Sequence, residues 1–305
     1  MWDFLRNSRI NLQGYELKMY KKSPYHIDED ACISFSGGRT SAYMLYKILQ
    51  EYGGTLPSHI KCVFANTGKE MPQTLDFVNA CSVNWGVKIH WVELKSIIRS
   101  EDKGKVSLNK EYHFVDYKSA SRNGEPFDIY LTGANALPTP VSRACTSHLK
   151  VRAIIWATRQ LGIEKGNIQC IGIRADEQRR ASKINPKPIE EGQERYLPLY
   201  WAGVDAPAVG RFWRESNFDL DLPNNNGVTD WGNCDLCYLK AINKKMSIIR
   251  ERPELADWWD NAEQKAGIPF RIDHPSYKKM KIIASDQGNL FDFSGDKSIS
   301  CYCGD

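Results

Sequence analysis

The stretch CISFSGGRTS, residues 32–41, decides the fold of this chain. Its first four residues suit a buried strand, and the two glycines that follow can turn the chain at positive φ. Between residues 41 and 52, apolar side chains recur at the spacing of one helical face. A strand, a glycine turn and a helix in this order direct backbone N–H groups and the positive helix end to one point. We therefore expect a phosphate-binding loop at residues 36–41.

The same alternation of strand and helix continues along the chain. Short apolar runs at 60–65, 87–92 and 168–173 predict three more strands, and helical patterns at 74–84 and 149–161 lie between them. Alternating strands and helices favour an α/β fold with a doubly wound, mostly parallel sheet. Ligands of such sheets bind at the carboxyl ends of the strands.

The character of the sequence changes after residue 200. We predict an α/β nucleotide-binding domain at 1–200 and a helical, cysteine-containing region at 201–305 that ends in a mobile tail. One helix is expected at 239–251, before a proline. The stretch 100–141 is polar and its apolar residues recur only weakly, so we predict a long loop excursion that is able to close over a site.

Composition is that of an ordinary globular chain, with 42% hydrophobic and 26% charged residues. No apolar run is long enough to span a bilayer, and the first residues lack the apolar centre of a secretory signal. We expect a cytoplasmic protein without membrane contact. The net charge of +4 suits an anionic ligand but does not by itself support nucleic-acid binding, which stays open, as does a homodimer.

Nine cysteines, an odd number, argue against a disulfide framework in a cytoplasmic chain. Cys234 and Cys237 have the spacing with which two thiolates chelate one metal or cluster. Cys145 and a cysteine of the tail could complete four sulfur ligands. An iron–sulfur cluster, a zinc ion and a metal-free thiol pair all remain open. Four other cysteines lie in apolar stretches and are expected to be small buried hydrophobes: Cys32, Cys62, Cys81 and Cys170.

The segment SFSGGRTS resembles the PP-loop of the adenine nucleotide α-hydrolases, ATP pyrophosphatases and phosphoadenylylsulfate (PAPS) reductases. Three further segments are similar to motifs of this superfamily and stand in the same order. VFANTGKEMPQT (63–74) resembles its DTG-x-x-x-PET segment, RACTSHLKVRAI (143–154) its CT-x-x-LK segment, and IGIRADEQRR (171–180) its G-(I/V)-R-x-x-E segment. YLPLYWAG (196–203) and WGNCDLCYLK (231–240) are similar to reductase-like members found in phages and mobile elements.

The resemblance implies an adenine nucleotide, ATP or PAPS, at the carboxyl edge of the sheet. Arg174 is also implied as a catalytic group, because a guanidinium pairs well with phosphate or sulfate. The implied nucleotide-binding residues are Ser36, Gly37, Gly38, Arg39, Thr40, Ser41, Asn66, Thr67, Gly68, Glu70, Lys150, Arg174 and Glu177.

In cluster-bearing relatives, comparable cysteines hold a [4Fe–4S] cluster. The resemblance thus implies Cys145, Cys234, Cys237 and Cys301 as ligands, with zinc less favoured, although this chain lacks the adjacent Cys-Cys pair of the adenylylsulfate reductases. The tail SISCYCGD is similar to the reductases' terminal Glu-Cys-Gly segment, whose thiolate attacks the sulfonate sulfur. Cys303 is therefore the predicted nucleophile and Cys301 the weaker candidate.

Three functions follow as alternatives. The first is sulfonucleotide reduction, with a thiol-redox protein as electron donor. The second is an ATP-dependent adenylylating enzyme that releases pyrophosphate and transfers sulfur, as in nucleic-acid thiolation. The third is a nucleotide-binding accessory protein of a mobile element or defence locus. Many ATP pyrophosphatases carry an acidic residue where this chain has Thr40, and this difference favours the reductase-like branch.

Overall fold

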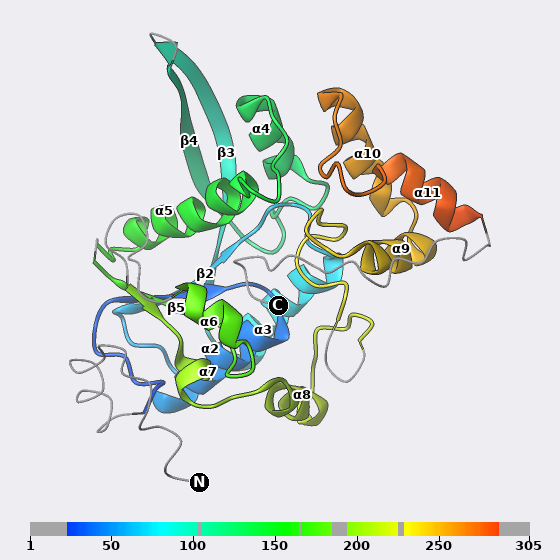
Figure 1. The fold of residues 1–305 in the computed structure, drawn as a ribbon. Coiled ribbons are helices and arrows are strands. Elements are labelled where there is room, and N and C mark those ends of the chain that lie inside the picture. The colour runs from blue at the N-terminus through cyan, green and yellow to red at the C-terminus, as the bar shows by residue number, and fades with distance from the viewer. Residues whose placement is uncertain (1–22, 103–104, 165, 185–193, 225–228, 287–305) are drawn as a thin grey trace.

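The computed structural model describes residues 23–102, 105–164, 166–184, 194–224 and 229–286. Its centre is a six-stranded sheet with the strand order β4-β3-β2-β1-β5-β6 (Figure 1). The strands are β1 (Ala31–Phe35), β2 (Ile60–Ala65), β3 (Ile89–Asp102), β4 (Lys105–Val115), β5 (Ile168–Ile171) and β6 (Glu194–Tyr196).

Within the described ranges, four of the five strand pairings of this sheet are parallel, and only β4 runs antiparallel to its neighbour β3. The sheet order places β1 at the centre, with β2 on one side and β5 on the other. Their carboxyl ends therefore lie together at one edge. The mostly parallel α/β sheet confirms the predicted fold class.

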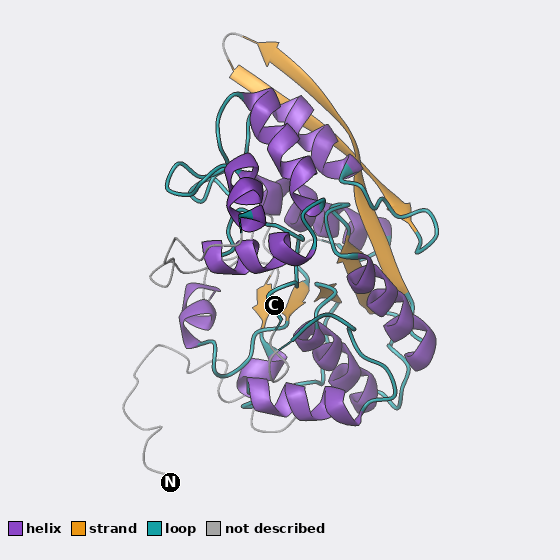
Figure 2. Ribbon diagram, turned by 90° about the vertical axis from the view of Figure 1, so that its right-hand side faces the viewer, coloured by secondary structure: helices purple, strands orange, loops and turns teal. Residues whose placement is uncertain are grey.

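Helices cover both faces of the sheet (Figure 2). Strand residues alternate between two apolar clusters: Ile33 and Phe35 pack with α2 and α3, whereas Cys32 and Val63 pack with α5. The four cysteines predicted to be small buried hydrophobes are all buried and unpaired. The first helices are α2 (Arg39–Glu51), α3 (Pro72–Trp85), α4 (Glu125–Ala134), the π-helix η1 (Thr146–Val151), α5 (Arg152–Gln160) and α6 (Gln178–Ile184).

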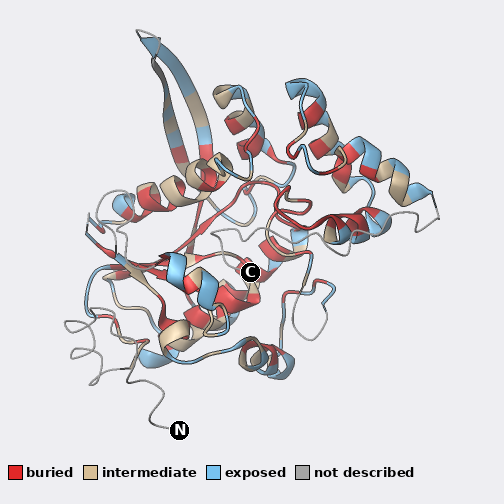
Figure 3. Cartoon of the chain, in the orientation of Figure 1, coloured by how far each residue is buried: buried red, intermediate tan, exposed pale blue. Residues whose placement is uncertain are grey.

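The chain around residues 100–141 differs from the expected loop excursion. The paired ends of β3 and β4 project from the sheet as a two-stranded ribbon, and α4 packs beside it (Figure 1). The projecting part is largely exposed, and Ile98 is 60% accessible (Figure 3). Because both faces of such a ribbon meet solvent, it lacks the apolar run that marks a buried strand. Periodicity therefore could not reveal it.

The later helices continue the apolar core. They are α7 (Pro198–Trp201), α8 (Ala206–Glu215), α9 (Ile242–Glu251), α10 (Leu255–Ala266) and α11 (Tyr277–Ser285). Trp259, Phe270 and Tyr277 are fully or almost fully buried and belong to the same apolar cluster as Ile33 of β1. The predicted division at residue 200 stays a prediction. Among the helices of the described ranges, none has the length and apolar content to cross a membrane.

Candidate functional site

The predicted phosphate loop connects β1 to α2. Gly37 has φ of 80°, whereas Gly38 is extended at φ −101° and precedes the first residue of the helix. The expectation that both glycines turn the chain at positive φ is therefore wrong for Gly38. A Cβ atom at Gly37 would lie 2.6 Å from Thr74 Cγ2, so the position requires glycine for space as well as for conformation.

Two serine hydroxyls close this loop. Ser36 donates to Ser41 Oγ from its backbone N–H, at 3.2 Å, and from its hydroxyl, at 2.9 Å. Ser41 Oγ donates in turn to Gly38 O at 2.9 Å. The loop after β5 meets the same point, because a Cβ atom on Gly172 would lie 3.1 Å from Ser41 Cα. The end of β5 and the start of α2 are thus in direct contact.

The side chain of Arg39 pairs with Asp219. Its guanidinium binds Asp219, with Nε 2.6 Å from Oδ1, and its carbonyl accepts from Trp213 Nε1 at 3.0 Å. An ion pair of this kind fixes α2 against the chain that follows α8. The part of Arg39 suited to a bound phosphate is its backbone N–H in the first helical turn.

Three other predicted residues meet beside the loop. Arg174 Nη1 donates to Thr40 Oγ1 at 3.0 Å and lies 3.6 Å from Glu177 Oε2. Glu177 also accepts from the backbone N–H of Arg174 at 3.0 Å and pairs with Arg180. Asp176 binds Arg174 Nε at 3.0 Å. Two carboxylates therefore orient a guanidinium toward the start of α2.

A cavity opens next to the loop, between the sheet and the helices η1 and α5. It lies at the carboxyl ends of β1, β2 and β5, where α/β sheets bind their ligands. Its empty volume, open mouth included, is about 490 Å³. It is lined by Ser34, Phe35, Ser36, Ala65, Lys150, Val151, Ile154, Gln169 and Ile171.

The segment after β2 folds onto itself. Asn66 donates from Nδ2 to Glu93 Oε1 at 2.6 Å and to Ser121 O at 2.8 Å, and its Oδ1 accepts from Gly68 N at 3.2 Å. Thr67 binds the Glu70 carboxylate through both its backbone N–H and its hydroxyl. These predicted nucleotide-binding side chains are buried and shape the segment; their contact with a nucleotide stays a prediction.

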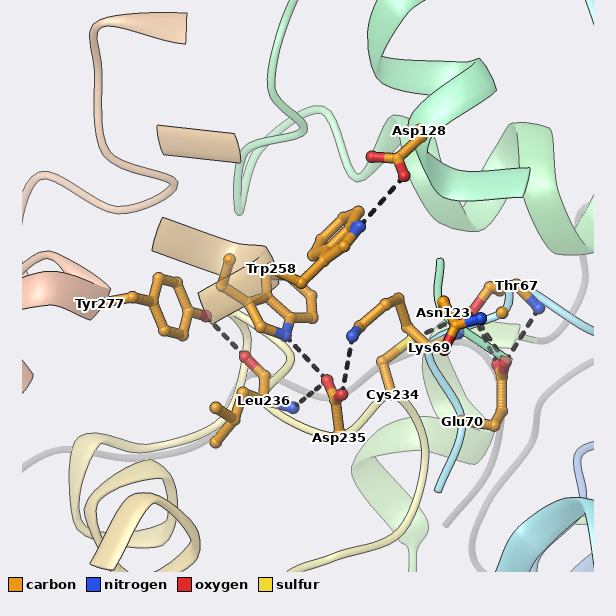
Figure 4. A network of polar contacts seen from close by, with 12 residues as sticks. Thr67, Lys69, Glu70, Asn123, Asp128, Cys234, Asp235, Leu236, Trp258 and Tyr277 are labelled. Atoms are coloured by element: carbon orange, nitrogen blue, oxygen red, sulfur yellow. Dashed lines mark hydrogen bonds and ion pairs between the residues drawn. The ribbon is translucent and has the colours of Figure 1, made fainter. Parts of the chain in front are cut away.

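That segment also holds Cys234, the first cysteine of the pair, in place (Figure 4). Glu70 and Cys234 form an antiparallel β-bridge, and Asp235 donates its backbone N–H to Lys69 O at 2.7 Å. Lys69 Nζ lies 2.9 Å from Asp235 Oδ2. Sequence reasoning missed Lys69 and Asp235, although each stands inside a quoted motif beside a predicted residue.

Three predicted metal ligands line a second cavity. Cys145 precedes η1, whereas Cys234 and Cys237 come from the loop before α9, and all three border a space of about 370 Å³, open solvent included. Cys301 and Cys303 lie outside the described residues. Within the described ranges, no group of three or more His, Cys, Asp or Glu side chains is arranged as a metal site. The ligand assignment therefore stays a prediction.

The thiol of Cys234 is held in its neutral form. Its pKa is raised to about 12, chiefly by burial; the Glu70 carboxylate also raises the pKa, while Lys150 and the Thr67 hydroxyl lower it in part. Cys145 Sγ lies 3.4 Å from the Tyr238 hydroxyl. A metal bound here would have to displace protons from these thiols.

Lys150 connects the two cavities. It belongs to the π-helix η1, a rare helix type that is frequent at functional sites, and it borders both the loop-side cavity and the cysteine cavity. Its Nζ lies 3.6 Å from Glu70 Oε1. Lys150 is therefore a positively charged residue that borders both cavities.

No protein-family model matches the chain. It is 28% identical over 214 residues to the uncharacterized nin region protein ORF290 of Escherichia phage lambda, which covers 70% of this chain and 67% of that protein. This similarity to a phage protein agrees with the expected phage and mobile-element context.

Among solved structures, the PAPS reductase of Candida auris in its phosphate complex aligns with a TM-score of 0.40 and 17% identity. The alignment covers 67% of this chain and 83% of that chain.

Proposed function

We propose that this protein binds an adenine nucleotide, ATP or PAPS, and performs PAPS-reductase-like sulfur chemistry. The observation that carries the proposal is the position of Lys150, which borders both the cavity beside the glycine loop and the cavity of the three cysteines. A phosphate or sulfate group placed between the two spaces would meet this charge.

The glycine loop supplies the anion end of the proposed site. Backbone N–H groups at the start of α2 and the positive helix end favour a bound phosphate. Arg174 adds a guanidinium, oriented by Asp176 and Glu177, that can pair with a phosphoryl or sulfonate group.

A [4Fe–4S] cluster at the cysteine cavity is the proposed cofactor, with zinc as the less favoured metal. Thiophilic metals prefer sulfur ligands, and Cys145, Cys234 and Cys237 line this cavity, although among the described residues they are not arranged as a metal site; Cys301 is the proposed fourth ligand. Such a cluster would supply a charged group beside the nucleotide. Lys150 would orient the substrate and offset the negative charge of the cluster and the nucleotide.

The proposed reaction uses the tail. The Cys303 thiolate attacks the sulfonate sulfur of PAPS, forming an S–S bond as the sulfur–oxygen bond to the nucleotide phosphate breaks. A dithiol donor protein then attacks the Cys303 sulfur, becomes a disulfide, and releases sulfite. Arg174 is proposed to stabilise the charge left on the departing phosphate.

The second candidate is an ATP-dependent enzyme that adenylylates its substrate, releases pyrophosphate and transfers sulfur. The phosphate loop suits either nucleotide. Thr40 favours the first candidate, because its hydroxyl accepts a hydrogen bond from Arg174 where an acidic side chain would serve magnesium.

Calorimetry with ATP and PAPS, followed by assays for sulfite and pyrophosphate, tests the proposal. We expect sulfite from PAPS in the presence of a dithiol, and a sulfonate adduct by mass spectrometry that Cys303→Ser removes. In Cys303→Ser, nucleotide binding and bound metal should persist. Pyrophosphate from ATP without any adduct from PAPS would favour the second candidate, and binding of neither nucleotide would overturn both.

A further inference from the structure

Gln169 is a buried polar residue in the middle of β5. Its side chain is 1% exposed, and its neighbours along the strand are Ile168 and Cys170. Its Nε2 donates to Ser34 Oγ of β1 at 2.7 Å. Among the described residues, its Oε1 has no hydrogen-bond partner. A buried amide oxygen without a partner is costly, so this position calls for a functional explanation.

The side chain lines the cavity beside the phosphate loop. Most of the other walls are apolar and come from Ala65, Val151, Ile154 and Ile171, which suit the faces of a flat ring. In such a cavity, an amide held by a neighbouring hydroxyl fixes the orientation of whatever group it binds.

The distance from the loop suits a nucleoside phosphate. Gln169 stands opposite Cys32 in the β1–β5 register, and its amide binds Ser34 Oγ, two residues before Ser36, or about 7 Å along the strand at roughly 3.3 Å per residue. A phosphate on the loop would thus leave room for a ribose and a base whose outer edge approaches Gln169.

We infer that Gln169 Oε1 accepts a hydrogen bond from the exocyclic 6-amino group of adenine and thereby selects adenine over 6-oxopurines. The inference rests on the proposed nucleotide binding and assigns its base specificity to one residue. A 6-oxopurine such as hypoxanthine would place an acceptor against an acceptor, and unsubstituted purine would leave the Gln169 oxygen unpaired.

Calorimetry with AMP, inosine monophosphate and purine riboside monophosphate tests the inference on the nucleotide core that ATP and PAPS share. We expect wild-type protein to bind AMP about tenfold or more tightly than the other two. Gln169→Met keeps the length of the side chain but removes the acceptor, so it should bind AMP and purine riboside monophosphate equally. Gln169→Glu keeps an acceptor and should retain the preference for AMP over purine riboside monophosphate.

Gln169→Leu replaces Gln169→Met if the latter does not melt cooperatively. An unchanged preference for AMP in the folded variant overturns the assignment of Gln169 and leaves the proposed function standing. A wild-type protein that binds none of AMP, ATP and PAPS overturns both.

Discussion

Lys69 Nζ and Asp235 Oδ2 form an ion pair of 2.9 Å that joins the segment after β2 to the loop carrying the cysteine pair (Figure 4). Both side chains are almost fully buried. Trp259 Nε1 donates to Asp235 Oδ1 at 2.8 Å, and Lys69 Nζ lies 4.9 Å from the centre of the Trp258 ring. This contact places Cys234 beside Thr67 and Glu70.

Removing one partner of this pair should destabilise the protein strongly. Lys69→Met leaves the Asp235 carboxylate buried without its counter-charge, so we expect a loss of about 3–5 kcal/mol in the free energy of unfolding. The double variant Lys69→Met, Asp235→Leu removes both charges and should be less destabilised than either single variant. Urea unfolding measures all three.

The exposed pair of Lys281 and Asp257 provides the control. Replacing Asp257 with Ala should change the free energy of unfolding by about 1 kcal/mol or less, because solvent screens this pair. Equal losses in the free energy of unfolding for Lys69→Met and for replacement of Asp257 with Ala would contradict the role given to Lys69.

Gly37→Ala should disrupt the phosphate loop. Its φ of 80° disfavours an L-residue, and the added Cβ would meet Thr74 Cγ2 at 2.6 Å. The left-handed conformation alone costs about 1–2 kcal/mol, and displacement of Thr74 adds to this. We expect loss of AMP binding by calorimetry together with a lower melting temperature.

Gly53→Ala is the matched control, because Gly53 also has positive φ but no heavy atom within 4 Å of the added Cβ. It should lose stability while binding AMP as tightly as wild type does. A Gly37→Ala protein that binds AMP with unchanged affinity would argue against phosphate binding at this loop.

Each cysteine of the second cavity should be needed for metal. After anaerobic purification we expect iron and sulfide in the wild-type protein, and their loss in Cys145→Ala, Cys234→Ala and Cys237→Ala. Cys81→Ala changes a cysteine buried in the core on α3, outside the cysteine cavity, and should keep the wild-type metal content. Stoichiometric zinc would make the site structural, whereas equal iron in all four variants would exclude these ligands.

His90 should make the protein sensitive to acid. Burial, together with the smaller effects of the Lys88 and Lys61 charges, lowers the pKa of its ring from 6.5 to about 4. Below pH 6.5 the unfolded chain takes up a proton that the folded chain accepts only near pH 4. The contribution of neutral His90 to the free energy of unfolding is therefore fully present above pH 6.5 and is lost as the pH falls from 6.5 to 4.

Melting temperatures of wild type and His90→Asn between pH 7.5 and 4 measure this effect. The variant should lose less stability over the acid range, although the difference will be modest because the ring is only half-buried. Parallel curves for the two proteins would show that His90 does not contribute.

Local sequence patterns predicted much of the architecture. The strand, glycine turn and helix around Gly37 form from residues within a few positions of one another, so their pattern predicted both the element order and the carboxyl edge where the cavity lies. The observed α2 begins at Arg39 and ends at Glu51, close to the predicted limits. The sequence pattern did not predict the ribbon of β3 and β4. Its exposed part has no buried face, so apolar residues do not recur along it at a regular spacing.

Other features depended on partners distant in the sequence. Pattern alone could not show that Arg39 would bind Asp219, that Lys69 would pair with Asp235, or that Gln169 would be buried against Ser34. The sequence by itself determined which residues could form strands, turns and helices, since those preferences act over a few neighbours. Only the tertiary structure decided which side chains meet, because burial and charge pairing between distant segments arise when the whole chain packs.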